Sequence, residues 1–291
     1  IMARRRRKSP LRKFRRRLSG VLTIIAVAAL ALQFISRARE VNADNDTTFR
    51  QSNASPADTV IAQALMMVRT NPALAENHLD YNAFTVSFNP ELHVPNWVAW
   101  ELTADETYGT TPRYNKFSAD PAVDGSAETW DYSYSGYDRG HMAPAGDMKW
   151  SDEAMKSTFY LTNICPQAKS LNTGAWKRLE EKCRQWARAD SSLIIICGPV
   201  LTDTIKEYLG DTRVAVPKRF FKVILSPNAV PMRGIAFVMP NGTVTGGIQK
   251  AATSIAEVEK ITGHDFFSAL PDSIEAEVES QNDFHFWSTI K

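Results

Sequence analysis

A short, wholly apolar run in the second half of the chain limits the folds that this sequence can adopt. Residues 192–200 read SLIIICGPV, in which Leu193 is followed by three isoleucines. Branched aliphatic residues favour strands, and a run this apolar is typical of a strand with both faces buried. We therefore expect residues 192–200 to form a strand in the middle of a sheet.

Other segments supply neighbours for this strand. Residues 220–227 (FFKVILSP) and 233–243 (RGIAFVMPNGT) are further strand candidates. Residues 81–103 alternate apolar and polar side chains in two pieces, which predicts two antiparallel strands joined by a turn around Asn89 and Pro90.

Helical periodicity is confined to a few segments of the chain. Apolar residues recur at close to helical spacing in residues 174–189, and a second helix is expected in residues 254–263, closed by Gly263. Beyond residue 58 there is no second break in composition and no internal repeat. The sequence thus predicts one α+β domain over residues 59–291, a mixed fold with a central antiparallel sheet.

The first 36 residues differ sharply from the rest. Residues 3–17 are strongly basic, and residues 18–35 (LSGVLTIIAVAALALQFI) carry no charge. This order is typical of a secretory signal or of a membrane anchor, and the 18-residue length does not separate the two. Ala29 and Ala31 offer a cleavage pattern of small residues, whereas the polar Gln33 fits an uncleaved anchor.

We therefore expect residues 1–36 to be a leader and residues 37–58 to be a polar linker. The domain would then be periplasmic or secreted, or anchored to the inner membrane by residues 18–35. A nuclear-localisation or RNA-binding tail is the alternative for the basic run, but such a tail needs no adjoining apolar segment.

The charge of the domain restricts how it can bind a polyanion. Residues 1–40 hold 12 of the 34 Lys and Arg but one of the 32 Asp and Glu, so the remaining 251 residues carry 22 basic and 31 acidic groups, a net charge of −9. Overall charge therefore gives no support for nucleic-acid binding, and any phosphate site must come from a local cluster.

The cysteines predict neither a disulfide framework nor a zinc site. Three are present, Cys165, Cys183 and Cys197, which permits one internal disulfide at most, and no CxxC pair occurs. Cys197 lies in the apolar run and is most simply a small core residue.

One short motif carries chemistry. Residues 138–141 read DRGH and place a carboxylate, a guanidinium, a glycine and an imidazole in succession. Arg139 can bind planar oxyanions such as phosphate, His141 can exchange a proton near neutral pH, and Gly140 leaves room for a close approach. The structural alternative is a strand end on which Asp138 and Arg139 pair and His141 is merely half-buried.

Two longer motifs follow. Asn163 opens N-x-x-P-Q, and N-x-G-x-W-x-x-L-E is complete from Asn172 to Glu180. With DRGH, these make the sequence resemble the DNA/RNA non-specific endonucleases of the ββα-metal (His-Me finger) class, the family that includes endonuclease G. The resemblance covers most of residues 81–272.

The resemblance implies a catalytic set. His141 would be the general base and Asn172 the one protein ligand of a water-rich Mg²⁺, for which Mn²⁺ is a possible substitute. Residues expected to support the phosphate and the water network are Arg139, Asn163 and Glu180, with Arg113 as a more loosely aligned contact to phosphate. The chemistry is consistent, because Mg²⁺ prefers oxygen ligands and keeps several waters. Hydrolysis also needs a deprotonated water and positive charge near the crowded oxyanions.

Helix geometry separates the roles of Asn172 and Glu180. In an ideal α-helix, eight residues correspond to about 80° around the axis and about 12 Å along it. Both side chains then face the same side, but they cannot both bind one small ion directly, so Glu180 is expected to act through metal-bound water.

Each residue also has a structural alternative. Asn172 could cap a helix, Glu180 could be a solvated charge, and Asn163 could close a strand end. Trp176 and Trp186 are expected in the core. The remaining basic residues of the segment are an ordinary charged helix face by default: Lys177, Arg178, Lys182, Arg184 and Arg188. The histidines outside the motif are expected to be structural.

The sequence thus predicts an exported, magnesium-dependent endonuclease that hydrolyses DNA and RNA. Two alternatives stay open: a catalytically inactive, membrane-tethered nucleic-acid-binding module, and a phosphodiesterase for another anionic substrate. A homodimer is possible.

Overall fold

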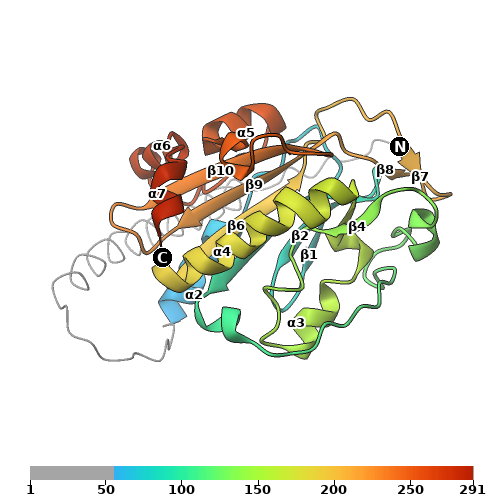
Figure 1. The fold of residues 1–291 in the computed structure, drawn as a ribbon, viewed down its shortest axis with the longest axis horizontal. Coiled ribbons are helices and arrows are strands. Elements are labelled where there is room, and N and C mark those ends of the chain that lie inside the picture. The colour runs from blue at the N-terminus through green and yellow to red at the C-terminus, as the bar shows by residue number, and fades with distance from the viewer. Residues whose placement is uncertain (1–55, 291) are drawn as a thin grey trace, which may run out of the picture.

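The computed structural model describes residues 56–290. Its centre is a sheet in which every neighbouring pair of strands is antiparallel (Figure 1). In spatial order its seven strands are β1 (Asn77–Asp80), β2 (Thr85–Asn89), β3 (Val94–Thr103), β6 (Ser192–Pro199), β9 (Arg219–Ser226), β10 (Arg233–Pro240) and β11 (Ala252–Thr253). The apolar run therefore forms the middle strand, as the sequence predicts.

Side chains of the central strands alternate between two apolar layers. Leu193, Ile195 and Cys197 of β6 face one layer, whereas Ile194 and Ile196 face the other. A strand with a layer on each face reads as a continuous apolar run, because neither set of side chains meets water.

Helices cover both faces of the sheet. One layer holds α4 (Lys177–Asp190) and α7 (Phe284–Thr289), and the other holds α2 (Pro56–Met66), α5 (Ile255–Thr262) and α6 (Asp272–Glu279). In Figure 1, α4 runs across the front of the sheet with its N-terminal end beside the short strand β4. No helix within residues 56–290 is long and apolar enough to cross a membrane.

Smaller elements lie at the ends of the sheet. Strand β4 (Asp138–His141) pairs with β5 (Ile164–Gln167), and β7 (Tyr208–Leu209) pairs with β8 (Val214–Ala215). The short helix α3 (Asp152–Ser157) lies between β4 and β5 in the chain. Short helical turns are formed by η1 (Asp105–Tyr108), η2 (Thr129–Tyr132), η3 (Leu161–Asn163), η4 (Leu171–Trp176) and η5 (Ile248–Lys250).

The predicted elements are present with some changes of boundary. The paired strands β2 and β3 and the helix α5 are confirmed, and Gly263 ends α5 with a left-handed φ of 73°. The helix expected from residue 174 begins as α4 at Lys177, after the π-helical turn η4. Helix α2 begins inside the predicted linker, and the leader lies outside the described residues.

Candidate active site

The DRGH motif is a complete strand rather than a strand end. Asp138 to His141 form β4, and β4 pairs with β5 so that Gly140 lies opposite Cys165 and His141 opposite Ile164. The alternative with an Asp138–Arg139 ion pair is wrong, because Asp138 accepts a hydrogen bond from Asn172 and Arg139 donates to a backbone carbonyl.

His141 lies in an apolar setting. Its side chain is buried, and its ring packs against Phe117 and Phe159 at centroid distances of 5.3 and 4.9 Å. The Nε2 atom is buried and has no hydrogen-bond partner in the structure. Burial, helped by the nearby charge of Arg113, lowers the pKa of His141 to about 3. The imidazole is therefore neutral at physiological pH, as a general base must be.

Three contacts hold the backbone at and just after His141. The indole Nε1 of Trp176 donates to the carbonyl of His141 at 3.3 Å, and the Cys197 thiol donates to the carbonyl of Met142 at 3.4 Å. Asn163 holds the backbone of Ala143 from both sides, accepting from its N–H and donating to its carbonyl, each at 2.9 Å. His141 thus begins a segment whose backbone is fixed at three successive residues.

Asn172 belongs to the π-helical turn η4, which contains a kink at Gly174 (φ −106°, ψ −111°). Such turns inside helices are frequent at functional sites. Asn172 Nδ2 donates to Asp138 Oδ2 at 2.9 Å, so the DRGH carboxylate orients the amide. No other hydrogen bond occupies the Asn172 side chain within residues 56–290, which leaves its Oδ1 available as a ligand. The alternative that Asn172 caps a helix is not supported, since no side-chain cap is formed there.

Glu180 lies on the first turns of α4 and is partly buried, so it is not the solvated charge of the structural alternative. Burial raises its pKa to about 7, against the positive charges of Lys222, Arg184 and Arg113. The expected geometry between Asn172 and Glu180 needs one correction. The kink at Gly174 separates them, so they do not share one regular α-helix.

The two predicted arginines contact different aromatic rings that pack on His141. Arg139 Nη2 donates to the carbonyl of Thr129 at 2.6 Å, and its guanidinium lies 5.5 Å from the ring centre of Phe117. Its buried Nε has no partner in the structure. Arg113 is exposed and lies 5.0 Å from the ring centre of Phe159, the ring that packs on His141. Both cations therefore contact the aromatic surroundings of the base.

Asn163 has a different position from the other predicted residues. Its side chain is fully buried, and its amide makes its three hydrogen bonds to backbone groups of Ala143 and Thr158. It reaches the site through the backbone next to His141. A role in the water network stays a prediction, and the contacts seen are structural.

Sequence reasoning missed a buried group of charges behind the site. Arg184 was assigned to a solvated helix face, but it forms an ion pair of 2.7 Å with the buried Asp147. Lys222, read only as part of a strand, is 1% exposed and acts electrostatically on Glu180. The alternation along β9 already places Lys222 on the side that faces α4, together with Phe220 and Ile224.

The donor set suits a hard divalent cation better than zinc. Within residues 56–290 no group of three or more His, Cys, Asp or Glu could hold a metal ion. A single amide oxygen, Asn172 Oδ1, oriented by Asp138, fits an ion that keeps most of its waters. Cys165, Cys183 and Cys197 are all free and buried, so no disulfide forms among them.

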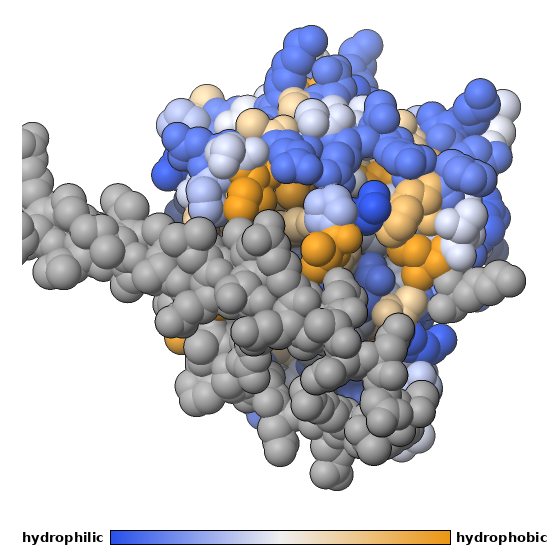
Figure 2. Space-filling model, turned by 90° about the vertical axis from the view of Figure 1, so that its left-hand side faces the viewer, coloured by the Kyte–Doolittle hydropathy of each residue, from blue (hydrophilic) through white to orange (hydrophobic). Residues whose placement is uncertain are grey.

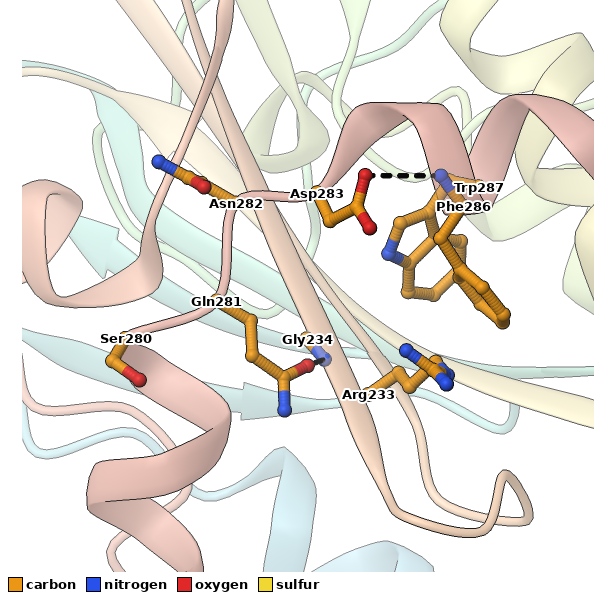
Figure 3. Close-up of a pocket in the computed structure, with 8 residues that line it drawn as sticks. All are labelled: Arg233, Gly234, Ser280, Gln281, Asn282, Asp283, Phe286 and Trp287. Carbon is orange, nitrogen blue, oxygen red and sulfur yellow. Dashed lines mark hydrogen bonds between the residues drawn. The ribbon is translucent and has the colours of Figure 1, made fainter.

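A cavity of about 280 Å³ lies away from these residues (Figure 3). It is bordered by Arg233 and Gly234 of β10, by the segment joining α6 to α7, and by Phe286 and Trp287 of α7. Trp287 packs on Trp186, which is about 15 Å along the helix from Trp176. On the left-hand face of the molecule (Figure 2), apolar patches are interrupted by hydrophilic residues. None of the candidate site residues lines the cavity.

Comparisons with known proteins agree with this geometry. The family model for DNA/RNA non-specific endonucleases matches residues 62–273. The chain is 34% identical over 286 residues to the mitochondrial nuclease EXOG of Mus musculus, a match that covers 91% of this chain and 76% of that protein. It is 33% identical over 217 residues to nuclease C1 of Cunninghamella echinulata var. echinulata, covering 69% and 86% of the two chains.

A solved structure agrees as well. A chain of the crystal structure of the EndoG/EndoGI complex superposes with a TM-score of 0.63 at 28% identity, covering 67% of this chain and 87% of that chain. Fold, site and relatives together define a nuclease, an enzyme that hydrolyses nucleic acid. The chain belongs to the DNA/RNA non-specific endonuclease family.

Proposed function

We propose that this nuclease is a Mg²⁺-dependent endonuclease that cuts DNA and RNA, with His141 as the general base and Asn172 as the metal ligand. The observation that carries the proposal is the pairing of a neutral, buried imidazole with an amide whose Nδ2 is fixed by Asp138. Metal dependence is general in endonuclease G-like enzymes, and Mn²⁺ is a possible substitute.

In this proposal each residue has a limited task. His141 removes a proton from the attacking water, and because Nε2 is buried, Nδ1 is the nitrogen assigned to accept it. Asn172 Oδ1 would hold the metal ion, and the ion would supply positive charge to the phosphate oxygens. Glu180 would accept hydrogen bonds from metal-bound water, and Arg113 and Arg139 would stabilise the negative charge that develops on the phosphate.

The alternative of an inactive binding module is less well supported. A binding module does not need a base kept neutral by burial, nor a carboxylate that orients an amide. The net charge of −9 outside the first 40 residues also gives no extended basic surface for tight binding. A phosphodiesterase for another anionic substrate would use the same residues, so the substrate panel in the assay decides between the two.

The test compares His141→Ala with Asn172→Ala on supercoiled DNA, RNA and a small phosphodiester. Both variants should fold, since neither side chain fills the main core. His141→Ala should lose about 10²- to 10⁴-fold in rate, the usual contribution of a positioned base, at any magnesium concentration. Added imidazole should restore part of its rate, whereas excess magnesium should restore Asn172→Ala. A His141→Ala enzyme that cuts at the wild-type rate would exclude the mechanism.

We also propose that residues 1–36 direct export and that membrane association depends on them alone. The support is the uncharged segment 18–35 after a basic run, which lies outside the described residues. A fragment that starts at about residue 40 should stay in the supernatant after a high-salt wash, while the full chain sediments with membranes. Sedimentation of the fragment would contradict this proposal and leave the enzymatic one untouched.

A further inference from the structure

Lys222 is a buried cation behind the active site. It lies on β9, its side chain is 1% exposed, and no ion pair holds its ammonium within residues 56–290. Its Nζ instead lies 4.5 Å from the ring centre of Trp176 and 4.9 Å from that of Trp100. An ammonium close to two indole rings is stabilised by each of them, most strongly where water is excluded.

The surroundings keep this lysine charged. Burial acts to lower its pKa, but the acidic groups around it, the Cys197 and Cys183 thiols and the Glu180 and Asp147 carboxylates, outweigh burial and raise it. Both thiols have raised pKa values and are neutral near pH 7, so the two carboxylates supply the opposing charge there. The ammonium is therefore a positive charge in the core near pH 7.

Its immediate neighbours are the residues that hold the base. Trp176 donates to the carbonyl of His141, and Cys197 donates to the carbonyl of Met142. Cys197 is the cross-strand partner of Lys222 in the pairing of β6 with β9, and the ammonium interacts with its sulfur. One charge thus contacts both side chains that bind these two successive carbonyls.

The other side of the ammonium faces the charged group on and near α4. Trp100, the second indole, donates to Asp147 Oδ2 at 3.2 Å, and Asp147 pairs with Arg184. Glu180 is faced by Lys222 from β9, by Asp147 from the segment after β4, by Arg184 from α4 and by Arg113 from the segment after η1.

We propose that Lys222 is a positioning residue of the active site: its ammonium fixes Trp176 and Cys197, which hold the backbone carbonyls of His141 and Met142. The inference rests on the proposed function of His141 and Glu180. Lys222 touches neither substrate nor metal in this account and acts through the residues in front of it.

A purely structural charge would behave differently from a positioning charge. Replacing a whole buried ion pair by apolar side chains is often neutral for the fold, but removing one partner leaves the opposing charges uncompensated and lowers stability. Lys222→Met should therefore have a lower Tm than the wild type, because Glu180 and Asp147 lose an opposing charge, and its kcat is measured well below that Tm on folded protein. If Lys222 positions the base, the variant should nevertheless lose about 10- to 100-fold in kcat with an unchanged KM, because small displacements of catalytic groups are costly.

The pH profile gives a readout that folding alone does not move. Without the ammonium, the pKa of Glu180 should rise further, so the acid limb of kcat in Lys222→Met should shift to higher pH. Lys222→Arg keeps the charge and should keep the wild-type limb even where its kcat is lower. Lys218→Met removes an exposed lysine from the turn before β9 and serves as the matched control, with wild-type kcat and pH profile.

A double-mutant cycle tests the path through Trp176. Trp176→Phe keeps a ring beside the ammonium but removes the N–H that binds the His141 carbonyl, so it should lower kcat without moving the acid limb. The combined variant should lose less than the product of the two single losses, because both act on one carbonyl. If Lys222→Met does not fold, Trp176→Phe with wild-type kcat would overturn the inference by itself.

Two failures are distinguishable. A wild-type protein without nuclease activity in magnesium would refute the proposed function. An active wild type and an inactive His141→Ala, together with a Lys222→Met enzyme that keeps wild-type kcat and pH profile, would refute the positioning role alone.

Discussion

Asn163 offers a direct way to separate support of the backbone from contact with the substrate. Its fully buried amide makes three hydrogen bonds of 2.9 Å, to the N–H and carbonyl of Ala143 and to the carbonyl of Thr158. Ala143 and Thr158 are themselves fully buried. Asn163→Ala would therefore leave three backbone groups without partners in a place that water does not reach.

The magnitude follows from these three groups. Each buried polar group left unpaired costs about 1–3 kcal/mol, and with partial relaxation the total is on the order of 4 kcal/mol. For a domain of this size, 1 kcal/mol corresponds to about 2–4 °C in Tm, so the variant should unfold roughly 10 °C below the wild type. Activity should fall as well, because Ala143 lies two residues after His141.

The assay is thermal unfolding beside nuclease rates measured well below the lower Tm. Asn163→Ala should lose stability and activity together, whereas Asn172→Ala should lose activity at a wild-type Tm. Asn282→Ala, an exposed asparagine, is the control and should change stability by less than about 0.5 kcal/mol. If Asn163→Ala kept its Tm and still lost activity, the amide would act on substrate or water, and the structural reasoning would be refuted.

Two further predictions concern pH. Because burial raises the pKa of Glu180 to about 7, wild-type kcat should fall as the pH drops below about 7, well above the pKa of His141. Glu180→Gln should have a low kcat that does not fall in this pH range. If kcat of that variant still fell below pH 7, the fall would belong to another titrating group. Burial and the neighbouring Glu259 raise the pKa of Glu279 to about 8 from an ordinary 4.5. The folded state therefore binds the carboxyl proton of Glu279 more tightly than the unfolded state does. The stability that this proton contributes is fully present below pH 4.5 and is lost as the pH rises through 8. Glu279→Gln should therefore raise Tm at pH 9 and leave it unchanged at pH 4; an equal change in Tm at both pH values would contradict this reasoning.

The fold was predictable where the sequence pattern reports burial. The run 192–200 specified the central strand, because only a strand with a layer on each face tolerates an unbroken apolar sequence. The pairing of β4 with β5 was implied only by the resemblance to the ββα-metal class and not by the pattern of apolar and polar residues. The two strands are four residues each and carry Asp138, Arg139 and Gln167, so no alternation of apolar and polar residues marks them.

The sequence predicted which residues belong to the candidate site better than it predicted how their backbone is shaped. The motif identified His141 and Asn172, and the structure ties them to one hairpin and one helical turn. The π-helical turn was not predictable, because helical spacing alone does not report a kink at Gly174. Arg184 was misassigned, since a basic residue on an amphipathic helix is usually solvated, and the buried Asp147 that turns it inward is distant in sequence.

Burial of the candidate site explains why the charged residues that the sequence analysis missed, Lys222 and Arg184, lie next to it. The same apolar surroundings lower the pKa of His141 to about 3 and raise that of Glu180 to about 7, because low polarity disfavours the charged form of each. A neutral base results without further support, but an ionised Glu180 requires compensating positive charge nearby. Lys222, Arg184 and Arg113 supply part of it, since they lower the Glu180 pKa against the effect of burial. A domain of net negative charge thus concentrates cations behind and beside this candidate site.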